Sequence, residues 1–183
     1  MKKIKFGALQ KKYQGKIFTI YERPVVLLDG SSGVFEYCAR PGSVSVLAFN
    51  EKKELLLIKE YRSGSGKLEW FLPTGQLDSK EEKPRAAANR ELREEAGFSA
   101  GKLRLLTKTS LSEKMLWDVY TFVATDLKIS PLPADPGECI VQRTFFPLKK
   151  AVQMAVDGTI EDEFIAYYII RFEYLSRTGN WQW

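Results

Sequence analysis

The chain has 183 residues, of which 44% are hydrophobic and 28% charged, and this composition is typical of one globular domain. It contains no histidine, which excludes Ser-His-Asp and Cys-His catalysis and every His-ligated zinc or iron site. The formal net charge is +5, and residues 1–67 carry 13 Lys and Arg against 6 Asp and Glu. Such a basic segment attracts anionic substrates, although a solvated lysine-rich surface is the plainer alternative.

The two cysteines, Cys38 and Cys139, are isolated from each other, so the sequence indicates reduced thiols rather than a zinc cluster or a redox pair. The Lys-rich beginning lacks the apolar stretch of a signal peptide, and no apolar run approaches the roughly 18 residues of a membrane span. We expect a cytoplasmic protein that does not enter a membrane. Without aromatic-glycine repeats or a sustained Lys/Arg run, nucleic acid is an unlikely partner.

Short strands are expected along the first half of the chain. The Asp-Gly step at 29–30 predicts a first hairpin, and the polar stretch at 50–54 predicts a second one between its flanking strands. The expected strands are residues 16–21, 24–28, 34–39, 43–49, 55–61 and 70–72.

The composition then changes to Ala, Glu and Arg, which predicts a helix over 84–96 with Gly97 as its C-terminal cap. Further strands are expected at 103–107, 117–124 and 139–146, followed by helices at 147–156 and 162–177. The last helix has a predicted core stripe of Phe164, Tyr168, Phe172 and Leu175. This order of elements predicts an α+β domain with a mixed sheet between helices.

Three carboxylates share one face of the helix expected at 84–96. Glu91, Glu94 and Glu95 fall within an arc of about 100° at helical spacing, where like charges repel. A divalent ion bound by the three carboxylates would offset this repulsion. Ligands that are all oxygen atoms favour Mg²⁺ or Mn²⁺ over zinc. The alternative is a solvated helix in which Arg90 and Arg93 neutralise the glutamates.

The residues around these glutamates resemble the Nudix box, G-x5-E-x7-REU-x-EE-x-GU. Its second half is matched completely, by Arg90, Glu91, Leu92, Glu94, Glu95, Gly97 and Phe98. Its first half departs from the pattern, because six residues instead of five separate Gly75 from Glu82. Glu82 keeps the spacing to Arg90 and is assigned to the first Glu of the box, with Glu81 as the alternative.

Two further segments resemble ADP-ribose and nucleoside diphosphate sugar pyrophosphatases of the Nudix family: the Lys-Glu-Tyr-Arg sequence at 59–62 and the Asp-Pro-Gly-Glu loop at 135–138. The chain departs from that subgroup at Phe71, where a Glu is common, and at 108–117, which lack the proline that often marks ADP-ribose specificity. The resemblance implies a Nudix-type α/β/α sandwich with a mixed central sheet. It also implies an N-terminal antiparallel strand region at 1–40 that dimerises, and a catalytic domain at 41–183.

The resemblance also implies roles for individual residues. The metal ligands would be Glu91, Glu95, Glu94 and the Thr74 carbonyl, with Mg²⁺ as the cofactor and Mn²⁺ as a possible substitute. The catalytic set would be Glu94, Glu138, Glu82 and Arg90, with Glu138 as a metal ligand or general base and Arg90 bracing the carboxylates. The substrate-binding set would be Arg62, Arg40 and Trp70. Arg62 and Arg40 would grip phosphate, and Trp70 would stack a base or pack in the core.

The function implied is the Mg²⁺-dependent hydrolysis of a nucleoside diphosphate sugar such as ADP-ribose to a nucleoside monophosphate and a sugar phosphate. One alternative is a pyrophosphohydrolase of nucleoside triphosphates or dinucleotide polyphosphates. A second is a non-catalytic Nudix domain that binds nucleotides or RNA, although such a domain would normally have lost glutamates of the box. The expected partners are the nucleotide sugar and a second copy of the chain.

Overall fold

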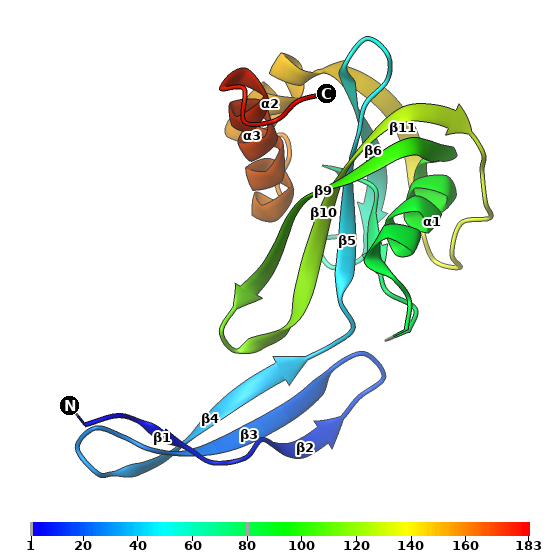
Figure 1. Ribbon diagram of the computed structural model, residues 1–183. Helices are drawn as coiled ribbons and strands as arrows, with labels where there is room; N and C mark the ends of the chain where they lie inside the picture. The colour runs from blue at the N-terminus through cyan, green and yellow to red at the C-terminus, as the bar shows by residue number, and fades with distance from the viewer. Residues whose placement is uncertain (1, 80) are drawn as a thin grey trace. The chain divides into compact units, whose positions relative to one another are not determined.

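The computed structural model describes residues 2–79 and 81–183, and the chain divides into two compact units (Figure 1). The N-terminal unit takes in the chain as far as Gly42 together with Thr109–Val119. The larger unit consists of Ser43–Lys108 and Tyr120–Trp183. The sequence predicted a domain boundary after residue 40. That prediction did not assign residues 109–119 to the N-terminal region.

The N-terminal unit is built around the strand β3 (Thr19–Val26), which pairs antiparallel with β1 (Lys5–Phe6), β2 (Gln10–Gln14) and β4 (Ser32–Ala39). The expected hairpin at Asp-Gly is confirmed, but the two strands expected at 16–21 and 24–28 are one. The Pro24 carbonyl accepts a hydrogen bond at 2.8 Å from the N–H of Gly7, a residue between β1 and β2. The missing N–H of Pro24 lies on that same edge, so it removes no bond to β4.

The larger unit contains two groups of strands. In the first, β5 (Ser43–Ala48) lies between β8 (Thr74–Gln76) and β10 (Met115–Ile129), and β9 (Phe98–Ser112) pairs with β10. β9 and β10 are much longer than the strands expected at 103–107 and 117–124. In the second group, β6 (Glu54–Arg62) pairs antiparallel with β7 (Lys67–Phe71) and β11 (Ile140–Pro147).

Three helices cover these strands. α1 (Pro84–Ala96) has the bounds that the sequence predicted, and it contacts β5 and β8. α2 (Leu148–Val156) and α3 (Glu163–Arg177) pack against each other, and Figure 1 shows them on the other side of the strands from α1. This layering agrees with the expected sandwich. No helix in the described parts of the chain is long and apolar enough to cross a membrane.

The prediction that β5 and β6 form a hairpin is wrong. They share one isolated bridge, between Phe49 and Leu55, and otherwise lie in different sheets. Both strands carry consecutive buried residues, at 44–48 and 55–58, instead of the alternation that a hairpin with one solvated face would show. Both runs are buried on both faces, and each strand has its neighbours in its own sheet, β5 between β10 and β8 and β6 between β11 and β7.

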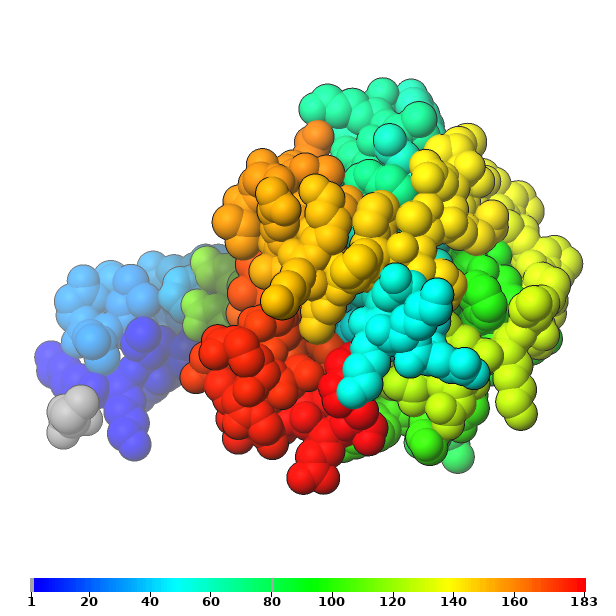
Figure 2. Space-filling model, turned by 90° about the horizontal axis from the view of Figure 1, so that it is seen from above, coloured from blue at the N-terminus to red at the C-terminus, as the bar shows by residue number. Residues whose placement is uncertain are grey.

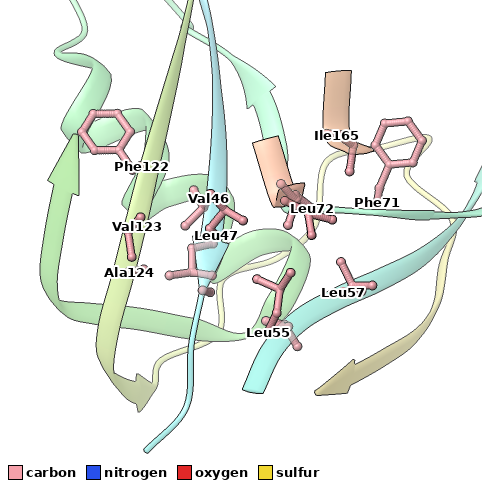
Figure 3. Packing of buried hydrophobic residues seen from close by; sticks show 14 of the residues in the cluster. Val46, Leu47, Leu55, Leu57, Phe71, Leu72, Phe122, Val123, Ala124 and Ile165 are labelled. Carbon is pink, nitrogen blue, oxygen red and sulfur yellow. The ribbon is translucent and has the colours of Figure 1, made fainter. Parts of the chain in front are cut away.

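The hydrophobic core of the larger unit lies between its strands and helices. Figure 3 shows side chains of β5, β6, β10 and α3 pointing toward one another in this core, among them Val46, Leu57, Val123 and Ile165. In α3 the predicted stripe is correct for Tyr168 and Phe172, which are buried, but Phe164 is 49% exposed and Leu175 only half-buried. The buried face of α3 instead includes Ile165 and Ile169.

The C-terminal residues extend this core. The Phe172 ring lies 4.8 Å from the Phe49 ring, 5.9 Å from Trp181 and 5.4 Å from Trp183 between ring centroids. Lys53 lies over the Trp183 ring, and Figure 2 shows the end of the chain (red) against the turn between β5 and β6 (cyan). Phe172 therefore joins α3, β5 and the C-terminal segment.

We predict that Phe172→Ala lowers the free energy of unfolding by about 3–5 kcal/mol, because the cavity removes contacts to three aromatic rings. The matched control, Phe164→Ala on the exposed face of the same helix, changes it by less than about 1 kcal/mol. Urea denaturation of the three proteins measures both values. Equal losses for the two variants would contradict this description of the core.

Candidate functional site

Helix α1 supplies two buried carboxylates. It begins with Pro84, which is preorganised for a first turn, and it ends at Gly97, whose φ of 82° is left-handed. The face that contacts β5 and β8 buries Ala87 and Leu92, and on it Glu91 and Glu95 are only 4% and 3% exposed. Buried glutamates are costly unless they are paired or bind an ion, so these two are candidates for function.

A third carboxylate joins them from a loop distant in the sequence. Oxygen atoms of Glu91, Glu95 and Glu138 all lie within 4.8 Å of one another. Glu138 is half-buried and directly precedes β11. We call these three residues the carboxylate cluster. The structure thus brings Glu138 beside the predicted metal ligands.

Burial raises the pKa of each member of the cluster. It raises the pKa of Glu91 to about 7 against the opposing effect of Arg90, and it raises the pKa of Glu95 well above its ordinary value. Burial also raises the pKa of Glu138. Repulsion from other members of the cluster adds to the shifts of Glu91 and Glu95, whereas Asp135, Glu60 and Glu94 add to the shift of Glu138. A divalent cation would relieve both the burial cost and the repulsion.

Arg90 braces the glutamates, as the sequence predicted. Its Nη1 atom donates to Glu91 at 2.8 Å and to Glu94 at 2.9 Å, and its Nε atom donates to Glu82 at 3.2 Å. Burial by itself lowers the pKa of Arg90, but these carboxylates outweigh it and raise the pKa. Glu94 is thus bound to Arg90 and lies outside the group of three whose oxygens come together.

Glu82 occupies the position that the spacing to Arg90 suggested. Besides accepting from Arg90, its carboxylate accepts from the Asp78 N–H at 2.7 Å. Glu81 is exposed, and its N–H donates to the Ser79 hydroxyl at 3.2 Å. The contact to Arg90 favours Glu82 over Glu81. Residue 80, between Gly75 and Glu82 in the sequence, lies outside the described residues.

Strand β8 brings backbone groups up to the helix glutamates. The Thr74 N–H donates to the Glu95 carboxylate at 2.7 Å, which opposes the rise in the pKa of Glu95. Gly75 lies so close to Glu91 that a Cβ atom at this position would overlap the Glu91 carboxylate. A larger residue at this position would therefore have to displace the Glu91 carboxylate from the place where Arg90 holds it.

The sequence did not single out Glu60, which is 7% exposed on β6 and whose charge contributes to raising the pKa values of Glu95 and Glu138. The sequence signal that could have identified Glu60 was its position close to the apolar run at 55–58, which predicts a buried strand. Glu60 accepts from Arg62 at 2.8 Å, and the Arg62 guanidinium lies 4.3 Å from the centre of the Phe71 ring. Phe71 thus contacts Arg62, the residue predicted to bind the phosphates of the substrate.

The other two predicted substrate ligands lie in different surroundings. Trp70 pairs with Lys59 across β6 and β7, so its side chain is on the opposite face of that hairpin from Glu60. Its ring packs edge-on against Phe146 at 5.2 Å, which favours core packing over base stacking. Arg40 belongs to the N-terminal unit, where its guanidinium lies 4.8 Å from the Trp117 ring centre and burial lowers its pKa.

Comparison with known proteins agrees with this site. The chain is 31% identical over 123 residues to the ADP-ribose pyrophosphatase of Bacillus subtilis (strain 168), a match that spans 67% of this chain and 66% of that protein. It is 28% identical over 171 residues to ADP compounds hydrolase NudE of Escherichia coli (strain K12), spanning 91% and 90% of the two chains. A crystal structure of ADP compounds hydrolase superposes with a TM-score of 0.80 at 27% identity and covers 97% of this chain and 96% of that one.

The family match covers both the helix and the acidic loop. Residues 39–168 match the NUDIX domain, and this span includes every member of the carboxylate cluster, Arg90 and the Thr74-Gly75 segment. The buried carboxylates, their arginine brace and the match agree with one another. The chain belongs to the NUDIX domain family, within which it resembles the ADP-ribose pyrophosphatases.

Proposed function

We propose that the chain is a pyrophosphohydrolase that cleaves the diphosphate of a nucleoside diphosphate sugar of the ADP-ribose type. The products are a nucleoside monophosphate and a sugar phosphate. The observation that carries the proposal is the carboxylate cluster on the Nudix helix. Relatives named for the hydrolysis of ADP-ribose and of ADP compounds support the substrate class.

The cluster fits a hard divalent cation. All of its donors are carboxylate oxygens, two of the three glutamates are buried, and burial and mutual repulsion destabilise their charged forms. Glu91, Glu95 and Glu138 would hold Mg²⁺ or Mn²⁺, and the Thr74 carbonyl is a further candidate ligand. When bound, the ion neutralises charge on the diphosphate and makes a bound water more acidic.

The chain's own residues perform the remaining tasks. Arg62 is oriented by Glu60 and Phe71 and would bind phosphate oxygens in a bidentate manner. A water oxygen attacks phosphorus, the bond to the bridging oxygen breaks, and the water proton passes to a carboxylate. We assign that proton to Glu138, because it is the most accessible member of the cluster and burial raises its pKa.

Two alternative functions can be weighed against this proposal. A nucleoside triphosphate or a dinucleotide polyphosphate has the same phosphoric anhydride, so the carboxylate cluster alone does not select against it. A non-catalytic nucleotide- or RNA-binding domain would not need three converging carboxylates. The intact cluster argues against that alternative.

We also propose that the protein is a homodimer formed through residues 1–40. The N-terminal unit exposes apolar side chains along its strands and turns, and the chain as far as Gly42 is rich in lysine. The exposed apolar residues are Phe6, Leu9, Tyr13, Ile17, Phe18, Val26, Leu28 and Val34. Exposed apolar patches and strand edges of this kind are typical of protein interfaces.

We predict that ADP-ribose and related nucleotide sugars are cleaved in the presence of Mg²⁺ in preference to nucleoside triphosphates and dinucleotide polyphosphates.

Glu95→Gln should lower kcat by about 10³-fold, because losing a metal ligand costs several kcal/mol of transition-state stabilisation. The exposed control Glu51→Gln should be unaffected. Product identification in ¹⁸O-labelled water measures the reaction. If Glu95→Gln kept most of the wild-type kcat at saturating Mg²⁺, the metal assignment would be wrong.

We predict that the stabilising effect of Mg²⁺ grows with pH. The pKa of Glu91 is about 7 in the folded chain and 4.5 ordinarily, so the folded chain binds the proton more tightly than the unfolded one. Without metal, the free energy of unfolding therefore falls as pH rises from about 4.5 to about 7, by at most ~1.4 kcal/mol per pH unit. Mg²⁺ binds the ionised form and offsets this loss.

Thermal unfolding with and without Mg²⁺ at about pH 5 and about pH 8 measures the effect. The shift in Tm should be larger at the higher pH. It should shrink at the higher pH in Glu91→Gln, which has no charge to neutralise. A shift that is equal at both pH values, or larger at the lower one, would contradict the assignment of Glu91.

We predict a dimer in light scattering at micromolar concentration, with about twice the 20.9 kDa mass of one chain. A charge placed on the N-terminal strands, as in Val34→Glu, should shift the protein toward monomer because it opposes burial of the apolar surface. Val156→Glu, an exposed valine in the larger unit, is the matched control and should leave the dimer intact. A wild-type monomer under these conditions would refute the dimer.

A further inference from the structure

The segment that carries Glu138 is tied to helix α1 before and after the loop. Helix α1 ends at Ala96, and the cap residue Gly97 donates its N–H to the Arg93 carbonyl at 3.2 Å. Here the Gly97 carbonyl accepts from the Ser130 N–H at 2.9 Å, and the Arg93 carbonyl accepts from the Leu132 N–H at 3.1 Å. The Arg93 side chain returns the contact, since its Nε atom donates to the Ser130 carbonyl at 3.0 Å. These bonds fix the chain just before the loop.

The chain beyond the loop is tied to the same helix by Arg143. Its Nε atom donates to the backbone carbonyl of Glu95 at 2.6 Å. This bond joins β11, which directly follows the Glu138 loop, to the residue whose side chain belongs to the carboxylate cluster. The negative end of the helix macrodipole favours a cation at this position.

Between these two attachments the chain is exposed and has few contacts of its own. Residues 133–137 are all exposed. The Glu138 N–H donates to the Asp135 carbonyl at 3.1 Å, and the Asp135 N–H donates to the Glu138 carboxylate at 3.3 Å. Repulsion from Glu91 and Glu95 acts to push Glu138 outward. The Tyr61 N–H donates to the Cys139 carbonyl at 3.0 Å and fixes the chain to β6 just after Glu138, so the attachment to helix α1 must come from other bonds.

We propose that Arg93 and Arg143 are positioning residues that hold the Glu138 loop against helix α1 and so complete the carboxylate cluster. The proposal rests on the proposed function of that cluster. Arg93 stands at the unspecified position of the Nudix box, between Leu92 and Glu94, so the motif gives it no role. Arg143 lies outside the box, five residues after Glu138.

Arg143→Met tests the proposal by removing the donor while keeping an unbranched side chain. A charge-assisted hydrogen bond is worth about 1.5–3 kcal/mol, so kcat should fall about 10- to 100-fold with little change in KM. Arg143→Lys can still donate to the Glu95 carbonyl and should recover part of the loss. Arg85→Met, an exposed arginine on the same helix, is the control and should match the wild type.

A double mutant separates positioning from general stability. Glu138→Gln alone should lower kcat by about 10²–10⁴-fold. If Arg143 acts through Glu138, Arg143→Met should cause little further loss in the Glu138→Gln background. A loss of the same size in both backgrounds would overturn the proposal, because it would show that Arg143 acts on some other part of the enzyme.

Hydrogen exchange in the metal-free protein gives a second readout that does not depend on activity. Arg143→Met and Arg93→Met should each speed the exchange of the hydrogen-bonded amides in 131–139, those of Leu132 and Glu138, by about tenfold or more, and should leave the core strand β5 unchanged. Unchanged exchange at 131–139 in both variants would overturn the proposal. If the wild-type protein cleaved no diphosphate substrate while exchange changed as expected, the proposed function would fail and the positioning role would stand.

Discussion

Three buried or half-buried carboxylates repel one another in the larger unit, and the groups around them must hold them together against this repulsion. Glu91, Glu95 and Glu138 place oxygen atoms within 4.8 Å of one another, and burial raises the pKa of each. Such an arrangement opposes folding unless other groups hold it. The helix, the strand β8 and the arginines around the cluster supply the hydrogen bonds that do so.

The two buried glutamates of the helix are held by different kinds of group. Glu95 accepts from the backbone N–H of Thr74, and Glu91 accepts from Arg90, which also binds Glu82 and Glu94. Because Arg90 holds several carboxylates at once, it fixes their relative positions without entering the space that the cluster's oxygens surround. Of the helix glutamates, Glu94 lies one turn after Arg90 and forms an i,i+4 ion pair with it.

The departure of Phe71 from the pattern of related pyrophosphatases has a local explanation. Where a glutamate is common, this chain places an aromatic ring, and the Arg62 guanidinium lies over that ring while bonding to Glu60. Glu60 thus provides the carboxylate partner of Arg62, and Phe71 provides the face on which it rests. Of these three residues, Glu60 also acts on the cluster, because its charge contributes to the raised pKa values of Glu95 and Glu138.

The sequence by itself determined helix α1 and its carboxylate face, because helix bounds, caps and the spacing of glutamates are local properties. It also determined that Arg90 would brace these glutamates. The family resemblance named Glu138, and the tertiary structure brought its carboxylate beside Glu91 and Glu95. Only the tertiary structure decided that the charge of buried Glu60 acts on the cluster and that β5 and β6 belong to different sheets. These outcomes depend on which distant segments pack together, and hydrophobic periodicity along one segment carries no information about its partner.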